Sequence, residues 1–341
     1  MSTGATAPRV LVLGASGFIG LNTIDALGAR GISALAGRRA RSNVIPLRSR
    51  KCELVLADAS DPRTLDSALA GIDVLVHAAA HYPKLSLDRD ATLRKGREEL
   101  EVVFDAVARS SVRRVVFVSS TATVAESRTG CSDESDVFAE PPGFGVYHDL
   151  KWHLEDLALR ENRFEVRVAC PSACLGPWDL RVGTSALIVA TARSMNPPHP
   201  EGWVSWVDAR DVGASLAELC VAPSAPKRLI LSAGSRKLHS FLVELAHRYQ
   251  TALPSEPLSN AEALALAHAE ELRAAREKVR PRLSLEIAEL TVYGVRMTGT
   301  RAESTLGLRY RTLSETLDAF DEWARRMSIL PPSAQTRTSS P

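Results

Sequence analysis

A tyrosine and a lysine one helical turn apart are the residues in this chain best suited to acid–base chemistry. Tyr147 and Lys151 stand at i and i+4, so on a helix they share one face. A phenol has a pKa near ~10, too high for efficient proton transfer at neutral pH, and a nearby cation favours the phenolate. The preceding run Ser119-Ser120-Thr121 offers a hydroxyl that could steady a substrate oxygen. Together these residues predict a site that moves a proton to or from an oxygen atom.

A second group of residues indicates a site for a dinucleotide. Glycines recur three residues apart, directly after the apolar run Val10–Leu13 and at the start of a helical pattern. Glycine lets the backbone approach a pyrophosphate, and the first-turn N–H groups of the helix then face the anion. A glycine-rich turn in an unrelated α/β protein is the alternative. The residues expected at this cofactor turn are Gly14, Ser16, Gly17, Phe18, Ile19 and Gly20.

The residues after the second expected strand bear on which nicotinamide cofactor binds. This strand, predicted at 33–36, is followed by Gly37, Arg38 and Arg39, and no acid is present there. An acid at this place would bind the ribose 2′-hydroxyl of NAD, whereas arginine suits the 2′-phosphate of NADP. The pattern therefore favours NADP over NAD. The alternative is that both arginines are simply solvated.

Further candidates follow other expected strands. Asp58 could accept a hydrogen bond from the adenine amino group, and a plain loop acid is equally compatible with its position. Small residues after the strand 74–77 would let a cofactor lie against the backbone, although packing alone also explains them. The remaining candidates for the cofactor are Ala59, Ala78, Ala79, Ala80, Pro171 and Cys174, and those for the substrate are Tyr82, Thr121, Phe138 and Trp178.

Strand-length apolar runs alternate with helical patterns up to about residue 170. This alternation predicts an α/β fold, a Rossmann-type doubly wound parallel sheet with right-handed crossovers. We expect a dinucleotide-binding core over 8–172 and a small, mainly substrate-binding lobe over 173–330. Segments around 204–232 are expected to return to the core. A Ser/Thr/Pro-rich tail over 331–341 is expected to be disordered.

Composition limits the other possibilities. The chain of 341 residues is 45% hydrophobic and 24% charged, as in an ordinary globular protein, and its net charge of +2 gives no electrostatic case for nucleic acid. No apolar run reaches the ~18 residues of a membrane helix. Residues 1–8 lack the apolar core of a signal peptide, so we expect a cytoplasmic protein. The five scattered cysteines suit free thiols in a reducing compartment, and we expect no metal site.

Taken together, these motifs resemble the extended short-chain dehydrogenase/reductase family, especially its dihydroflavonol reductase, 3β-hydroxysteroid dehydrogenase and sugar-epimerase group. The resemblance covers about residues 8–327. The segments that carry it are Gly14–Gly20, Asp58, His77–Ala80, Val118–Thr121, Tyr147 with Lys151, Pro171 with Gly176-Pro177, and Asp208–Val212.

The resemblance implies an NADP-dependent oxidoreductase that acts on a small molecule. Tyr147 would be the proton donor or acceptor and Lys151 its partner, with Thr121 preferred to Ser120 as the catalytic hydroxyl. Two departures from the family pattern stand out: the fourth helix lacks its usual asparagine, near Gly96, and the usual Arg-Pro is Cys170-Pro171. The family also implies a homodimer.

Three functions remain in competition at this point. The first is a ketone or aldehyde reductase, or the reverse alcohol dehydrogenase. The second is a nucleotide-sugar epimerase, and the third is a non-catalytic dinucleotide-binding regulator. The paired Tyr147 and Lys151 argue against a regulator. The arginines after the second strand favour a reductase, because NADPH is the cofactor that cells keep for reductions.

Overall fold

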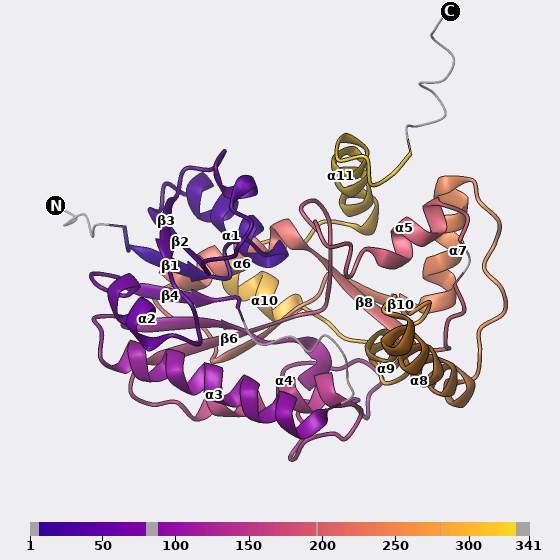
Figure 1. The fold of residues 1–341 in the computed structure, drawn as a ribbon, viewed down its shortest axis with the longest axis horizontal. Coiled ribbons are helices and arrows are strands. Elements are labelled where there is room, and N and C mark those ends of the chain that lie inside the picture. Colours follow the sequence, from indigo (N-terminus) through magenta and orange to yellow (C-terminus); the bar gives the residue numbers. More distant parts are fainter. Residues whose placement is uncertain (1–6, 80–87, 196, 280, 332–341) are drawn as a thin grey trace, which may run out of the picture.

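The computed structural model describes residues 7–79, 88–195, 197–279 and 281–331. Its larger part is a parallel sheet of seven strands with helices on both faces (Figure 1), in the order β3-β2-β1-β4-β5-β6-β9. The predicted doubly wound α/β fold is therefore confirmed. The strands are β1 Val10–Leu13, β2 Ala34–Arg38, β3 Glu53–Leu56, β4 Val74–His77, β5 Arg114–Val118, β6 Glu165–Pro171 and β9 Arg228–Leu231.

The central strands are apolar throughout because both faces of the sheet are covered. In β1, Val10 and Val12 pack into one hydrophobic core, and Leu11 and Leu13 pack into the other. Successive side chains of a strand point to opposite faces, so a strand buried on both sides reads as a continuous apolar run. The helices of the first core are α1 Phe18–Ala29, α6 Ala209–Val221 and α10 Thr300–Leu306; those of the second are α2 Pro62–Ala68, α3 Arg89–Ala108 and α4 Val146–Arg160.

Local capping residues fix where several helices begin. The side chain of Asp61 accepts a hydrogen bond from the backbone N–H of Arg63, and Pro62 is the first residue of α2, as the sequence predicts. Ser259 and Glu262 form a capping box at the start of α8 (Asn260–Glu277). These ends are therefore determined locally, without help from the rest of the fold.

A smaller lobe is built on a second sheet of three strands in the order β10-β8-β7. Its core contains large aromatic side chains, among them Trp206, Phe241, Phe320 and Trp323. β8 pairs within this lobe, whereas α6 packs against α1, and β9 pairs with β6 of the main sheet. The lobe strands are β7 Ala173–Leu175, β8 Trp203–Asp208 and β10 Gly234–Lys237, and the lobe helices are α5 Ala186–Ala192, α7 Leu238–Tyr249, α8, α9 Leu285–Val292 and α11 Leu313–Arg326.

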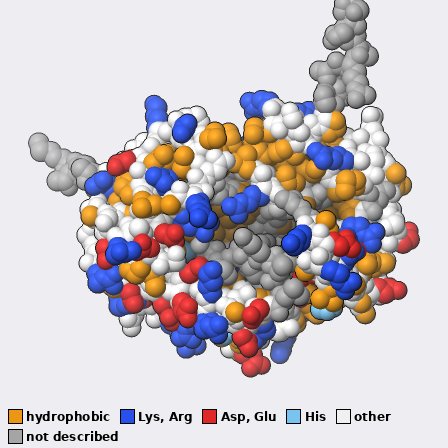
Figure 2. Space-filling view, viewed as in Figure 1, with side chains coloured by type: hydrophobic (Ala, Val, Ile, Leu, Met, Phe, Trp, Pro, Cys, Tyr) orange, Lys and Arg blue, Asp and Glu red, His pale blue; other side chains and the backbone are white. Residues whose placement is uncertain are grey.

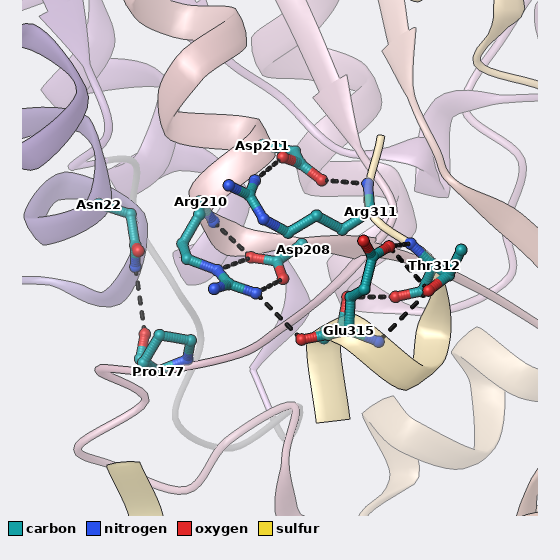
Figure 3. A network of polar contacts seen from close by, with 9 residues as sticks. Asn22, Pro177, Asp208, Arg210, Asp211, Arg311, Thr312 and Glu315 are labelled. Atoms are coloured by element: carbon teal, nitrogen blue, oxygen red, sulfur yellow. Dashed lines mark hydrogen bonds and ion pairs between the residues drawn. The ribbon is translucent and has the colours of Figure 1, made fainter. Parts of the chain in front are cut away.

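Polar contacts fasten the lobe to the sheet at the start of α6 (Figure 3). Asp211 accepts hydrogen bonds from the backbone N–H of Arg311, at 2.7 Å, and from its guanidinium. Arg210 pairs with Asp208 at 2.6 Å and also reaches the carbonyl of Glu315 on α11. Charge-assisted bonds of this kind are strong and directional, so they set how α11 sits on α6.

Candidate functional site

The turn between β1 and α1 has the geometry of a phosphate site. Gly14 has a φ of +79°, and a Cβ there would lie 2.6 Å from the carbonyl oxygen of Ala78, which follows β4. A Cβ at Gly20 would collide with the carbonyl oxygen of Gly14, so helix and turn touch backbone to backbone. Gly17 is exposed and is the N-cap of α1, which has no side-chain cap. The first N–H groups of α1 are thus left for an external acceptor, as a dinucleotide pyrophosphate requires.

The other residues predicted at this turn lie at the same place. Ser16, Phe18 and Ile19 are half-buried, and Phe18 and Ile19 pack against the core around α1 and α6. Ala78 donates its backbone N–H to the carbonyl of Leu13 at 3.0 Å, which continues the pairing of β1 with β4 beyond the strands. The glycine turn and the end of β4 therefore form one continuous surface.

Two arginines lie where β2 ends. Arg38 is half-buried and is the last residue of β2, and Arg39 is exposed in the turn that follows. Within the described part of the chain, neither guanidinium has an ion-pair partner. The Asp58 carboxylate, after β3, accepts hydrogen bonds from the N–H and the hydroxyl of Ser60, at 3.0 and 2.8 Å. A guanidinium can bind a phosphate through several donors at once.

Tyr147 and Lys151 lie together near the start of α4, as their spacing predicts. The Lys151 Nζ is 5.7 Å from the centre of the Tyr147 ring. The side chain of Ser120, the N-cap of the short 3₁₀ turn η2 (Thr121–Thr123), hydrogen-bonds Tyr147. Thr121 is the first residue of that turn, where the chain leaves the direction of β5. The structure thus brings Tyr147, Lys151 and Ser120 together, and the catalytic role of Thr121 stays a prediction.

Burial shifts the pKa values of both groups, that of Tyr147 away from neutral pH and that of Lys151 toward it. Desolvation raises the pKa of Tyr147 above its usual value, Glu286 raises it further, and the hydrogen bond from Ser120 lowers it. Desolvation lowers the pKa of Lys151 to about 8, although nearby carboxylates, Glu155 first among them, oppose this shift. Lys151 therefore titrates close to physiological pH, where a small change in its surroundings alters its charge.

His77, the last residue of β4, is a buried neighbour of Lys151. Its burial, with the charge of Lys151 as a smaller cause, lowers its pKa to about 4, so its ring is neutral at physiological pH. The ring packs against Phe117, with 5.5 Å between the ring centres. His77 also lines a small cavity together with Gly96 on α3, the position noted for its missing asparagine, and with Ala59 and Ala79.

The remaining predicted cofactor contacts are buried parts of the sheet edge. Pro171 ends β6 and pairs with Leu231 of β9. Cys174 lies in β7, and burial raises the pKa of its thiol to about 12, so it is a packing residue rather than a nucleophile. Ala80 and Tyr82 lie outside the described residues.

Aromatic side chains cover the start of α4. Phe144 stacks on Tyr293, with ring centres 4.1 Å apart, and meets Phe138 edge-on at 5.7 Å. His148 on α4 also contacts Phe144 and Tyr293. Phe138, one of the predicted substrate residues, thus belongs to an aromatic cluster beside Tyr147.

Trp178 lies in a different setting. The Arg50 guanidinium sits over its ring at 4.3 Å, and the ring of Trp323 lies 6.3 Å away. Arg50 in turn pairs with Asp25 on α1 at 2.7 Å. These contacts make Trp178 part of the join between the core and the lobe.

Helix α9 is a part of the site that sequence analysis did not single out. Glu289 on α9 is buried, and its carboxyl packs so closely on Gly145, the N-cap of α4, that no Cβ would fit there. Glu286, one turn earlier, raises the pKa of both Tyr147 and Lys151. Glu286, Glu289 and Tyr293 follow i, i+3, i+7 spacing, which places them on one helix face. That spacing is the only signal in the sequence that could have indicated them.

Figure 2 shows one face of the molecule, which is hollowed near its centre. Lys and Arg side chains lie around the hollow. None of the described helices is both long enough and apolar enough to cross a membrane.

One protein family and several curated proteins resemble this chain. The model of the NAD dependent epimerase/dehydratase family matches residues 10–214. A sterol demethylase protein B from Methylococcus capsulatus is 33% identical over 209 residues, 60% of this chain and 63% of that protein. A Stigmatella aurantiaca ketoreductase, of a farnesylated dihydroquinoline oxide, is 33% identical over 155 residues, 45% of this chain and 46% of that protein.

Solved structures show the same fold. A nucleoside-diphosphate-sugar epimerase from Pseudomonas aeruginosa has a TM-score of 0.79 at 22% identity, covering 96% of this chain and 100% of that one. Yeast methylglyoxal/isovaleraldehyde reductase Gre2, complexed with NADPH, has a TM-score of 0.70 at 18% identity, covering 94% and 100%. The chain spans less than two thirds of the length of the curated relatives it matches.

Proposed function

Because the chain belongs to the NAD dependent epimerase/dehydratase family, we propose that it is an NADP-dependent reductase of ketones or aldehydes, or the reverse alcohol dehydrogenase. The observation that carries the proposal is that the half-buried Tyr147 and the buried Lys151 lie together, with Ser120 hydrogen-bonded to the phenol. Tyr147 and Lys151 lie on α4, and Ser120 follows the carboxyl end of β5. This is the same edge of the sheet as the glycine turn. Parallel strands place all their carboxyl ends at one edge, where ligands of such folds bind.

Each side chain has a separate task in the proposed reaction. A bound NADPH would supply the hydride for the carbonyl carbon. Tyr147 donates its hydroxyl proton to the carbonyl oxygen as negative charge develops there, and Ser120 donates a hydrogen bond in the same place. Lys151, as a cation, makes the resulting phenolate less costly, because an opposite charge nearby favours the charged form.

The choice of NADP rests on Arg38 and Arg39. Both lie at the carboxyl end of β2, and among the described residues neither forms an ion pair. Guanidinium groups bind phosphate through several donors at once. We therefore propose that they hold the 2′-phosphate of NADP.

The substrate is proposed to be a largely apolar carbonyl compound. The support is the aromatic cluster of Phe138, Phe144 and Tyr293 at the start of α4, beside Tyr147. Pockets for small molecules are mostly apolar, with a few polar groups that fix orientation. The Stigmatella relative, named as a ketoreductase of a farnesylated ring, is consistent with this class.

An absorbance assay separates reductase from epimerase. Purified protein is given NADPH with a panel of aryl and alicyclic ketones and aldehydes, and nicotinamide absorbance and alcohol product are followed together. We expect NADPH to be consumed in equal amount to the alcohol formed. An epimerase would instead accumulate a sugar epimer with no net change in absorbance. No turnover with this panel or with a panel of nucleotide sugars, while the cofactor still binds, would support a regulator.

A further inference from the structure

One turn beyond Lys151, helix α4 carries a buried carboxylate that the proposed mechanism does not use. The Glu155 side chain is almost entirely buried and is surrounded by donors. Its Oε2 accepts a hydrogen bond from the Ser119 hydroxyl at 2.5 Å and lies 2.8 Å from the Thr123 hydroxyl. Its Oε1 accepts from the Arg228 Nε at 2.6 Å. A buried carboxylate held by a guanidinium and hydroxyls is a rigid anchor, because removing one partner leaves a costly unpaired charge.

The two hydroxyl partners bracket the turn that bears the catalytic hydroxyl. Ser119 directly precedes Ser120, and Thr123 ends the 3₁₀ turn that Ser120 caps. Arg228, from β9, also donates to the carbonyl and the hydroxyl of Thr123, at 3.3 and 3.1 Å. The turn is therefore fastened to α4 at both ends and to β9 at one, which fixes Ser120 relative to Tyr147.

A further carboxylate completes the buried network on the side of β9. Arg228 donates to the backbone carbonyl of Glu134 at 3.2 Å, and the Glu134 side chain accepts from the N–H of Ile230 at 2.9 Å. Glu134 is itself buried. The network thus crosses from α4 through the 119–123 turn to β9 without a break.

Glu155 also acts on the charge of Lys151. The two residues stand at i and i+4 on one face of α4, and both side chains are buried, so solvent screens their interaction only weakly. Burial lowers the pKa of Lys151, and Glu155 is the largest influence against that shift. The other titratable groups that face Lys151 are Tyr147 on α4, Glu286 on α9, Cys170 on β6, Cys174 on β7 and His77 on β4.

We propose that Glu155 is a positioning residue that holds the 119–123 turn against the catalytic helix and supplies the negative charge that keeps Lys151 an ammonium ion. Its positioning role rests on the proposed reductase chemistry, whereas its effect on Lys151 does not depend on turnover. Glu155→Gln would keep the shape of the side chain and remove its charge. Glu155→Asp would keep the charge and shorten the anchor.

The test measures the ionisation of Lys151 directly. Lysine is rare in this chain, so ¹³C-labelled lysine side chains can be titrated by NMR, with Lys151 identified by Lys151→Arg. The titration is run on the full chain, with and without NADP. We expect Lys151 to titrate about one pH unit lower in Glu155→Gln, because the charge that stabilises the ammonium is gone. In Glu155→Asp, Lys151 should titrate within about 0.3 pH units of the wild type, because the negative charge is retained.

A matched control is Asp321→Asn, which breaks another buried ion pair, with Arg248 at 2.7 Å, between α7 and α11. It should leave the titration of Lys151 unchanged. If Lys151 titrates alike in the wild type and Glu155→Gln, or if Asp321→Asn displaces it equally, the proposal is overturned. Should Glu155→Gln fail to fold, a displaced titration in Glu155→Asp would contradict the proposal in its place.

Steady-state kinetics test the positioning role separately. With an active ketone, kcat of Glu155→Asp should fall about tenfold while KM stays within about threefold, since a loosened Ser120 affects the transition state more than substrate binding. An unchanged kcat would overturn the positioning role. If the wild-type protein reduced no carbonyl compound, the proposed function would fail, and the NMR titration would still decide whether Glu155 sets the charge of Lys151.

Discussion

Tyr147 illustrates at the residue scale why a proton carrier needs neighbours. Burial alone moves its pKa upward, away from the range useful at neutral pH, and Ser120 acts in the opposite direction. Lys151 lies 5.7 Å from the ring but is itself buried, so its own charge depends on nearby carboxylates. The chemistry of the pair is therefore a property of several side chains and not of the Tyr-Lys spacing alone.

Tyr147→Phe should fold normally, bind NADP and lose nearly all reductase activity. The change keeps the ring and removes only the proton carrier, and a general acid contributes on the order of 10²–10⁴ in rate. The measurement is kcat with an active ketone, beside NADP affinity by fluorescence. Tyr310→Phe is the control, because that hydroxyl lies 3.5 Å from Ser215 in the core, and it should leave kcat near the wild-type value. Substantial activity in Tyr147→Phe would show that another group carries the proton.

Changing Arg38 and Arg39 together to alanine should remove most of a preference for NADPH over NADH. We expect that preference to be about tenfold or more, equivalent to ~1.4 kcal/mol of binding free energy. Affinities of both cofactors, measured by calorimetry, give the ratio. Replacing the exposed Arg94 and Arg97 on α3 by alanine removes the same net charge and should leave the ratio unchanged. Equal affinities for NADPH and NADH in the wild type would mean that the two arginines do not bind the 2′-phosphate.

At the scale of elements, the packing of helix α9 against the start of α4 carries a free-energy cost, because it buries a carboxyl group. Glu289 is buried, its Oε2 has no hydrogen-bond partner among the described residues, and burial together with Glu271 and Glu286 raises its pKa to about 7. Its carboxyl lies against Gly145, beside the N-terminus that orients Tyr147. Carboxyl groups with raised pKa values collect at functional sites, so this cost is consistent with a site near α9.

Glu289→Gln should stabilise the protein at pH 8 and change little at pH 4.5. The folded-state pKa is above the unfolded value of 4.5, so the carboxyl costs no stability below that pH and progressively more as pH rises through 7. We expect about 2 kcal/mol at pH 8 from urea unfolding, less than the full shift because the site relaxes. The exposed Glu98→Gln should have no such effect. A gain in stability that is equal at both pH values would show that Glu289 is not the titrating group.

The sequence predicted the elements that are determined locally. The strands β1 and β4 were predicted with the bounds observed, because each is a short apolar run followed by glycine or other small residues. β2 was predicted to end at residue 36 but includes Gly37 and Arg38, since pairing with β1 and β3 continues past the apolar run. Helices α5, α7 and α9 were not predicted, because the tertiary packing of the lobe decides them more than local pattern does.

The same distinction applies to the site. The spacing of Tyr147 and Lys151 and the glycine turn were readable because one helix or one turn holds each group. The hydrogen bond between Ser120 and Tyr147 depends on where η2 bends the chain, which no spacing revealed. Glu155, Arg228 and Glu289 come from elements that meet only in the folded chain. Which residues share a site across elements is set by topology.

At the scale of the whole molecule, the site lies where the sheet edge meets the lobe. The main sheet supplies the glycine turn and the 119–123 turn, and α9 of the lobe reaches the start of α4. The network at Asp208, Asp211 and Arg311 fastens the lobe to α6. The position of α9 at the start of α4 therefore depends on how the lobe sits on the sheet. The predicted homodimer remains a prediction.

The most direct test of the proposed function follows a labelled hydrogen. Purified protein is incubated with NADPH that carries deuterium at the transferable position of the nicotinamide and with an aryl ketone that it reduces, and the alcohol is examined by mass spectrometry. The account predicts one deuterium at the carbinol carbon for each NADPH oxidised, and no labelled alcohol with Tyr147→Phe. Unlabelled alcohol, or alcohol formed with no matching oxidation of NADPH, would contradict it.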